Sequence, residues 1–194
     1  MAKEYTDEKE ELKKGGSLFK TWADKTGITM QPNPTIGNVR FSAIQKGTGG
    51  KDFIDVYMSA KNARIMFREI YENFGEQAKR RFEKDKANSY PQAYLFTSGK
   101  GGSEKFGLGT GQKGLVFQLQ EKGENGKWRQ KFVPVLWDDL QEFAFRYLLV
   151  TGLIHCEEGY YKDITDAFLE GVRYRDSVHG KNTTHEQEDE DPWA

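Results

Sequence analysis

The chain has 194 residues, of which 36% are hydrophobic and 30% charged, and its formal net charge is −1. This length fits one large domain, or two small ones that share a core. No apolar run approaches the roughly 20 residues needed to cross a bilayer, and residues 1–7 lack the apolar core of a secretion signal. The single cysteine, Cys156, excludes an internal disulfide, so we expect a cytoplasmic protein, and the lack of an apolar span predicts no membrane partner.

The net charge conceals an asymmetry between the body and the C-terminus. Residues 186–194 contain five acids, and no Lys or Arg follows Lys181. Without those acids the formal charge of residues 1–185 is −1 + 5 = +4. A basic body with an acidic end predicts an interaction tail.

The N-terminal region predicts a helical arm over residues 1–27. Residues 3–14 are rich in Glu and Lys, and Gly15 and Gly16 follow them as a stop. Leu18, Phe19 and Trp22 have the spacing of one side of a second helical turn.

The next segment predicts strands, a turn and a helix. Residues 39–46 and 52–59 have strand patterns around the glycine-rich turn 46–51, and residues 28–31 are a possible further strand. In 52–59 alternation puts Ile54, Val56 and Met58 on one face, with Phe53, Asp55 and Tyr57 on the other. A helix follows over 60–74 and extends less regularly to about 86.

The second half repeats this pattern. Strands are predicted at 92–97, 105–108, 115–120 and 128–135, and a helix at 136–150. Turn 122–127 aligns with turn 46–51 at an offset of 76 residues. The sequence therefore predicts an α+β fold with two strand-hairpin-helix units, at about 28–86 and 92–151. A closing helix at 160–174 completes a binding domain over 28–175, and 176–194 form a disordered acidic tail.

Residues suited to catalysis are few. Two of the three histidines, His179 and His185, lie in or near the expected tail, and no cluster has metal-ligand spacing. His155 and Cys156 are adjacent in sequence, so their side chains are expected to point in different directions. The glycine loops 98–102 and 107–111 lack the Gly-Lys-Ser/Thr ending of a phosphate loop. We therefore expect a protein that is not an enzyme and has no metal or cofactor.

Basic and aromatic residues occur together on the predicted hairpins. Single-stranded nucleic acid is bound by this combination, because cations follow the backbone and bases stack on flat side chains. If Phe132 faces the core, then Arg129, Lys131 and Val133 face outward. Lysines beside turns also protect strand edges without any ligand, and that alternative stays open. The candidate nucleic-acid-binding residues are Arg40, Lys46, Lys51, Phe53, Tyr57, Lys100, Lys105, Trp128, Arg129 and Lys131.

Residues 132–143, with a last strand leading into a helix that carries Trp137 and Leu140, resemble the repeat end of the Whirly and positive-cofactor-four superfamily. In that superfamily four antiparallel strands and a helix form a single-stranded-DNA-binding unit, used as a dimer or as a tandem pair. Residues 93–150 match this pattern, and 39–86 would be a diverged first unit. The resemblance implies packing roles for Trp137 and Leu140. Gln112 to Leu115 only loosely echo the Lys-Gly-Lys-rich strand start of plant Whirly proteins.

The C-terminus is similar to the acidic tips of bacterial and phage single-stranded-DNA-binding proteins, which close with proline and a bulky aromatic. Acids of this kind compete with DNA phosphates, and the aromatic anchors a partner. The resemblance implies recruitment of replication or recombination proteins through Asp189, Glu190, Asp191, Pro192 and Trp193. A solvated tail without a partner is the alternative.

We thus expect a single-stranded-DNA-binding protein that supports replication or recombination of a phage or mobile element. An RNA-binding regulator is one alternative, and a structural or protein-interaction protein is another. The oligomeric state is left open.

Overall fold

The computed structural model describes residues 2–33, 37–84, 92–111 and 114–179. Contacts group them into two compact units, one over residues 17–156 and one built from residues 2–16 and 157–179. Each unit is described by itself. The expected acidic tip at 186–194 falls outside the described residues. The division into an arm, a binding domain and a tail stays a prediction.

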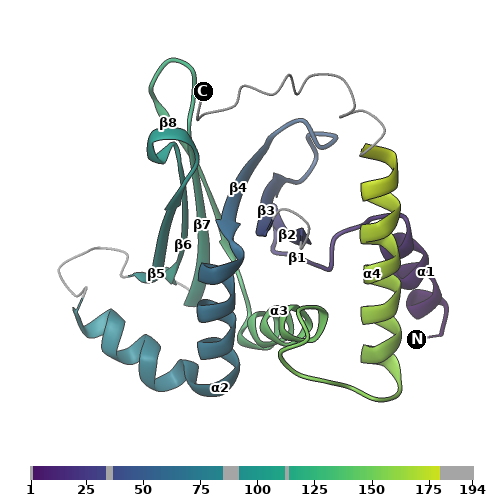
Figure 1. Ribbon diagram of the computed structural model, residues 1–194. Helices are drawn as coiled ribbons and strands as arrows, with labels where there is room; N and C mark the ends of the chain where they lie inside the picture. Colours follow the sequence, from purple (N-terminus) through teal and green to yellow (C-terminus); the bar gives the residue numbers. More distant parts are fainter. Residues whose placement is uncertain (1, 34–36, 85–91, 112–113, 180–194) are drawn as a thin grey trace, which may run out of the picture. The chain divides into compact units, whose positions relative to one another are not determined.

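The larger unit contains two four-stranded antiparallel sheets, each followed by a helix (Figure 1). Sheet A has the order β1 (Phe19–Trp22), β2 (Thr26–Asn33), β3 (Asn38–Gln45) and β4 (Phe53–Ser59), and α2 (Ala60–Lys84) follows it. Sheet B has the order β5 (Gln92–Ser98), β6 (Glu104–Gly111), β7 (Gly114–Lys122) and β8 (Trp128–Pro134), and α3 (Trp137–Val150) follows it. A short 3₁₀ turn, η1 (Lys100–Gly102), lies between β5 and β6. The shared strand order confirms the predicted α+β fold with two units.

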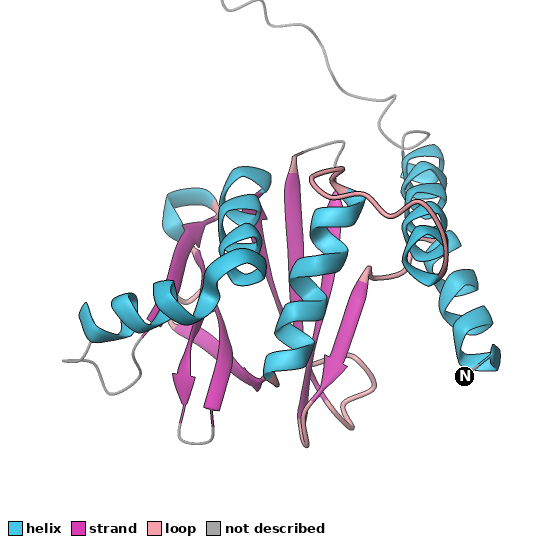
Figure 2. Cartoon of the chain, turned by 90° about the horizontal axis from the view of Figure 1, so that it is seen from below, coloured by secondary structure: helices cyan, strands magenta, loops and turns pink. Residues whose placement is uncertain are grey.

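Alternation along the strands explains which faces are buried. In β4, Ile54, Val56 and Met58 are buried, whereas Phe53 and Tyr57 are exposed, as the sequence predicts. The buried faces of the two sheets meet each other, and we call these the inner faces. Helices α2 and α3 lie on the side of the sheets that is nearest the viewer in Figure 2.

Aromatic rings join the two sheets and the two helices into one core. Phe41 of β3 contacts Phe106 of β6 at 4.5 Å between ring centroids. Phe117 of β7 contacts Phe143 of α3 at 5.6 Å. Leu140 of α3 is buried, as its packing role requires, but Trp137 at the start of α3 is 39% exposed. We call the opposite faces of the two sheets the outer faces. Because this core packs tightly against the inner faces, it fixes the position of both sheets.

Residues 19–22 form strand β1, so the predicted second helical turn is wrong. Phe19 packs edge-on against Phe143, with ring centroids 4.2 Å apart, and the Thr21 hydroxyl donates to Asp139 at 2.8 Å. Lys20 and Trp22 point to the opposite face and are exposed. Four residues of alternation are too short to outweigh a helical spacing of apolar residues in the sequence.

The smaller unit is a pair of helices, α1 (Ala2–Lys13) and α4 (Tyr160–His179). Gly171 of α4 lies so close to α1 that an added Cβ would be 1.8 Å from the Leu12 carbonyl oxygen. Lys9 also forms an ion pair with Asp163 at 3.2 Å. Helix α4 extends past the expected end at 174. Within the described ranges, no helix is both long and apolar enough to span a membrane.

Candidate nucleic-acid interface

The ten candidate residues fall on three different surfaces of the larger unit. Lys105 and Trp128 lie on the outer face of sheet B, and Lys100 lies in the adjacent β5–β6 turn. Arg129 and Lys131 lie between the sheets. Arg40, Phe53 and Tyr57 lie on the outer face of sheet A, with Lys46 and Lys51 in its β3–β4 turn.

The outer face of sheet B combines aromatic and cationic side chains. Trp128 is 42% exposed and Phe132 is 39% exposed, and both point outward from β8. The Lys105 ammonium lies over the Trp128 ring, 4.5 Å from its centroid. Lys122 is the cross-strand partner of Trp128 and is also exposed. Cations and a flat ring therefore lie together near the turn end of the face.

Four glutamines form a hydrogen-bonded network across this face. Gln92 of β5 donates to the Gln118 carbonyl of β7 at 3.3 Å, over the strand between them. Gly107 of β6 makes room, because a Cβ there would be 2.6 Å from Gln92 Oε1. Gln118 and Gln120 both donate to Gln130 Oε1 of β8, at 3.4 and 3.0 Å. The network thus offers neutral amide groups between the exposed aromatic rings.

The carboxylates of sheet B lie on the other face. Its strands contain two, Glu104 and Glu121, which are cross-strand partners and share the inner face. Glu104 accepts a hydrogen bond from the Tyr57 N–H at 2.9 Å, at the free edge of β4. Glu121 pairs with Arg129 at 3.1 Å. The described outward positions of β5–β8 accordingly carry lysines and no carboxylate, which favours a polyanionic ligand.

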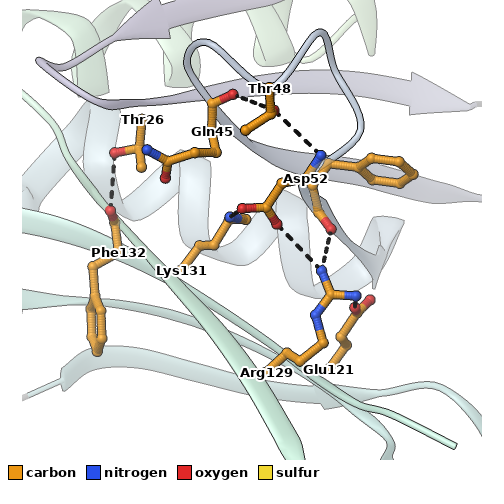
Figure 3. A network of polar contacts seen from close by, with 9 residues as sticks. Thr26, Gln45, Thr48, Asp52, Glu121, Arg129, Lys131 and Phe132 are labelled. Atoms are coloured by element: carbon orange, nitrogen blue, oxygen red, sulfur yellow. Dashed lines mark hydrogen bonds and ion pairs between the residues drawn. The ribbon is translucent and has the colours of Figure 1, made fainter.

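Arg129 and Lys131 belong to an inter-sheet ion cluster with Asp52 and Glu121 (Figure 3). Lys131 pairs with Asp52 at 2.8 Å, and its side chain is only 10% exposed. Arg129 approaches Asp52 at 3.5 Å and donates to the Phe53 carbonyl at 3.1 Å. The prediction that these two cations lie on the outer face is wrong, although the Arg129 side chain is still 53% exposed. The predicted burial of Phe132, on which it depended, is wrong as well.

The reversal of β8 follows from what its inner face meets. Val133 is fully buried among the core residues, so its neighbours at alternate positions share the inner face. Asp52, which directly precedes β4, and Glu121 of β7 pair with the two cations that this register brings inward. In Figure 3 the Phe132 ring points away from this cluster, while its carbonyl accepts a hydrogen bond from Thr26 at 3.1 Å.

A partly buried cluster of polar side chains attaches β5 to α2. The Tyr94 hydroxyl donates to Glu69 of α2 at 2.7 Å, and Arg81 pairs with the same carboxylate at 2.8 Å. Burial, and then the hydrogen bond to Glu69, raise the pKa of Tyr94 well above its usual range. Tyr94 therefore stays a neutral donor, and α2 holds the edge strand of sheet B.

On sheet A, one candidate cation is neutralised. Arg40 binds Asp55 through two nitrogens, at 3.0 and 2.5 Å, and Ser42 donates to the other oxygen of that carboxylate. Phe53 and Tyr57 flank this ion pair along β4.

Trp22, Phe132, Leu95 and the glutamine network are surface features that the sequence patterns do not predict. Alternation starting from the buried Val133 would have placed Phe132 and Gln130 outward. Trp22 lies in a segment whose apolar spacing predicts a helix. Among the described residues, no group of three His, Cys, Asp or Glu side chains is placed to hold a metal ion.

No protein-family model and no curated protein sequence matches the chain. Among solved structures, it is similar to the plant transcriptional regulator PBF-2, with a TM-score of 0.40 and 8% sequence identity. That likeness covers 84% of this chain and 94% of the other. With similarity this low, the ligand has to be inferred from the chain's own surfaces.

Proposed function

We propose that the chain is a single-stranded-DNA-binding protein and not an enzyme, and that the outer face of sheet B is its binding surface. The observation that carries this proposal is the composition of that face. Trp128 and Phe132 are exposed beside Lys105 and Lys122, and both carboxylates of the sheet are on the opposite face. Exposed rings stack with bases, and lysines attract phosphates.

The geometry favours an unpaired strand over a duplex. A base can stack on Trp128 only if its flat face is accessible, and a duplex buries those faces in its own stack. The amides of Gln120 and Gln130 can donate to and accept from base edges, which are likewise occupied in a duplex. The proposed ligand is therefore single-stranded.

Fluorescence anisotropy with labelled oligo-dT tests the proposal. Trp128→Ala removes one stacking surface and should weaken binding by about 5- to 150-fold, the equivalent of about 1–3 kcal/mol for one stacked base. Leu153→Ala is the matched control, because Leu153 is 44% exposed but follows α3 rather than lying on a sheet. Equal affinity of both variants and the unaltered chain would refute the assignment of sheet B.

The choice of DNA over RNA is tested with oligo-rU of equal length. A reader of the 2′-hydroxyl should favour the ribose, so tighter binding of oligo-rU would convert the proposal to an RNA-binding regulator. If the chain shows no salt-dependent affinity for either oligonucleotide, a protein-interaction role is favoured instead. A place in replication or recombination of a phage or mobile element is proposed from the acidic C-terminal sequence alone.

A further inference from the structure

The outer face of sheet A carries a row of side chains that crosses all four strands. Trp22 is the cross-strand partner of Gly27, Gly27 of Ile44, and Ile44 of Phe53. Direct partners share a face, so these positions form one line on the sheet. Trp22 is 50% exposed and Phe53 is 43% exposed. Two aromatic rings thus lie at the two ends of the row.

Gly27 determines how Trp22 lies. A Cβ at Gly27 would be 2.4 Å from Cε3 of the indole and 2.6 Å from Cδ2. The ring therefore rests directly on the backbone of β2, which only a residue without a side chain permits. One face of the indole contacts the strand, and the exposed half of its surface is available for a second flat group.

Lysines lie in the turns at the same end of the sheet. Lys25 is in the β1–β2 turn, and Lys46 and Lys51 are in the β3–β4 turn. The two turns are joined by a hydrogen bond from the Lys46 N–H to the Lys25 carbonyl at 2.8 Å. All three side chains are exposed, and none forms an ion pair with a described residue. Asp24 is exposed in the same region, whereas Asp52 pairs with Arg129 and Lys131.

The internal repeat provides an independent observation. Strand β4 has exposed aromatic residues at its first and fifth positions, Phe53 and Tyr57, and β8 has Trp128 and Phe132 at the same two positions. The turn before each strand begins and ends with lysine, at 46 and 51 in one copy and at 122 and 127 in the other. Both copies of the unit thus present the same arrangement on their outer faces.

We propose that the outer face of sheet A is a second site for single-stranded nucleic acid, with Trp22 and Phe53 as stacking surfaces and the turn lysines as phosphate contacts. The inference shares its ligand class with the proposed function and uses none of the residues of sheet B. One chain would then hold two separate segments of single strand, and could bring two complementary strands together.

Calorimetric titration of the full chain with an oligo-dT of about eight nucleotides, a length within the range that one single-strand groove holds, counts the sites. We expect two oligonucleotides for each chain. Trp128→Ala should abolish or weaken one of them, and the double change Trp22→Ala with Phe53→Ala the other, each by about 5- to 150-fold for every stacked base lost.

Gly27→Ala is the sharper variant, because it removes no chemical group. Its methyl group should lift the indole from β2 and weaken the sheet A site, while leaving the sheet B site at its original affinity. Thermal unfolding of each variant shows whether the sheet survives. Thr29→Ala, on the same strand and face but outside the row, is the matched control and should leave both sites intact.

The outcomes separate this inference from the proposed function. One oligonucleotide for each chain, lost in Trp128→Ala and unaffected by folded Trp22→Ala with Phe53→Ala, overturns the sheet A site and keeps the sheet B site. The opposite pattern keeps sheet A and refutes the proposed function at sheet B. A single site weakened by both sets of changes overturns the claim of two sites, because one strand would then contact both sheets. Absence of binding with folded protein refutes both.

Discussion

Salt dependence distinguishes the cations that face solvent from those that lie between the sheets. Lys105 and Lys122 lie on the outer face of sheet B, whereas Lys131 is buried against Asp52 at 2.8 Å. On a single strand, each neutralised phosphate contributes about −0.7 to the slope of log K against log salt. Replacing Lys105 and Lys122 by alanine should therefore make that slope shallower by about 1.4, if each lysine contacts one phosphate.

The comparison variant changes Lys131→Met together with Asp52→Asn, which removes one charge of each sign. Because this pair neutralises itself in the free protein, its loss should leave the slope within about 0.3 of the original, less than half of one phosphate contact. Anisotropy titrations with oligo-dT between about 50 and 200 mM salt measure both slopes. All chains also carry Trp22→Ala and Phe53→Ala, so that sheet B alone is measured.

The reverse result would refute the assignment of faces. If the Lys131 and Asp52 pair changes the slope by about 0.7 and the two outward lysines change nothing, phosphates enter between the sheets. The ion cluster would then have to open on binding. Circular dichroism of each variant confirms that the sheets are retained before the slopes are compared.

Three further predictions concern the core, the helical unit and the C-terminus. Burial raises the pKa of Tyr147 to about 12, so the stability that its neutral hydroxyl confers is complete below about pH 10 and is lost as pH rises through 12. The unfolding midpoint of Tyr147→Phe should therefore fall less than that of the unaltered chain across that window, and an unchanged pH profile would exclude Tyr147 as the cause. Gly171→Ala should destabilise the packing of α1 on α4 by about 1–3 kcal/mol in chemical denaturation, because the methyl group meets the Leu12 carbonyl; full stability would contradict the close approach. Truncation after His185 removes five acids and should tighten binding of oligo-dT more at low salt than at high salt, since the Debye length falls from about 30 Å at 0.01 M to about 10 Å at 0.1 M. If the truncated and full chains have equal affinity at every salt concentration, the tail does not compete with DNA.

The sequence predicts the elements of the larger unit well wherever one periodicity extends over many residues. Strand β4 shows this, because Ile54, Val56 and Met58 alternate with exposed residues and the buried face is the apolar one. Helix α3 shows it for a period of three to four, with Leu140, Phe143 and Tyr147 buried. Local patterning suffices there, since the apolar side of each element is also its inner side.

Strand β8 shows where local patterning fails. One face carries the apolar residues Trp128 and Phe132 and the other only Val133, and the cations Arg129 and Lys131 favour placing the second face in water. The structure instead turns that face inward, because Asp52, just before β4, pairs with both cations. Val133 is buried and the Lys131 side chain is 10% exposed, whereas Arg129 stays 53% exposed. Asp52, the partner that Lys131 and Arg129 share, is more than 70 residues away in sequence, so no local pattern could have identified it. Glu121, the other partner of Arg129, lies on the neighbouring strand β7.

The two outer faces carry aromatic residues at the same two positions of their last strand, but the residue between those two positions differs. At the third position of the last strand, β8 has Gln130 within a neutral amide network, whereas β4 has Asp55 bound to Arg40 and Ser42. A carboxylate between two stacking rings repels a phosphate. Because Arg40 is paired with that carboxylate, its positive charge is not available to the phosphate. The shared aromatic positions are the reason that we propose both faces for single-stranded nucleic acid. The difference at this position predicts that sheet B, with lysines and no carboxylate outward, binds it more tightly than sheet A.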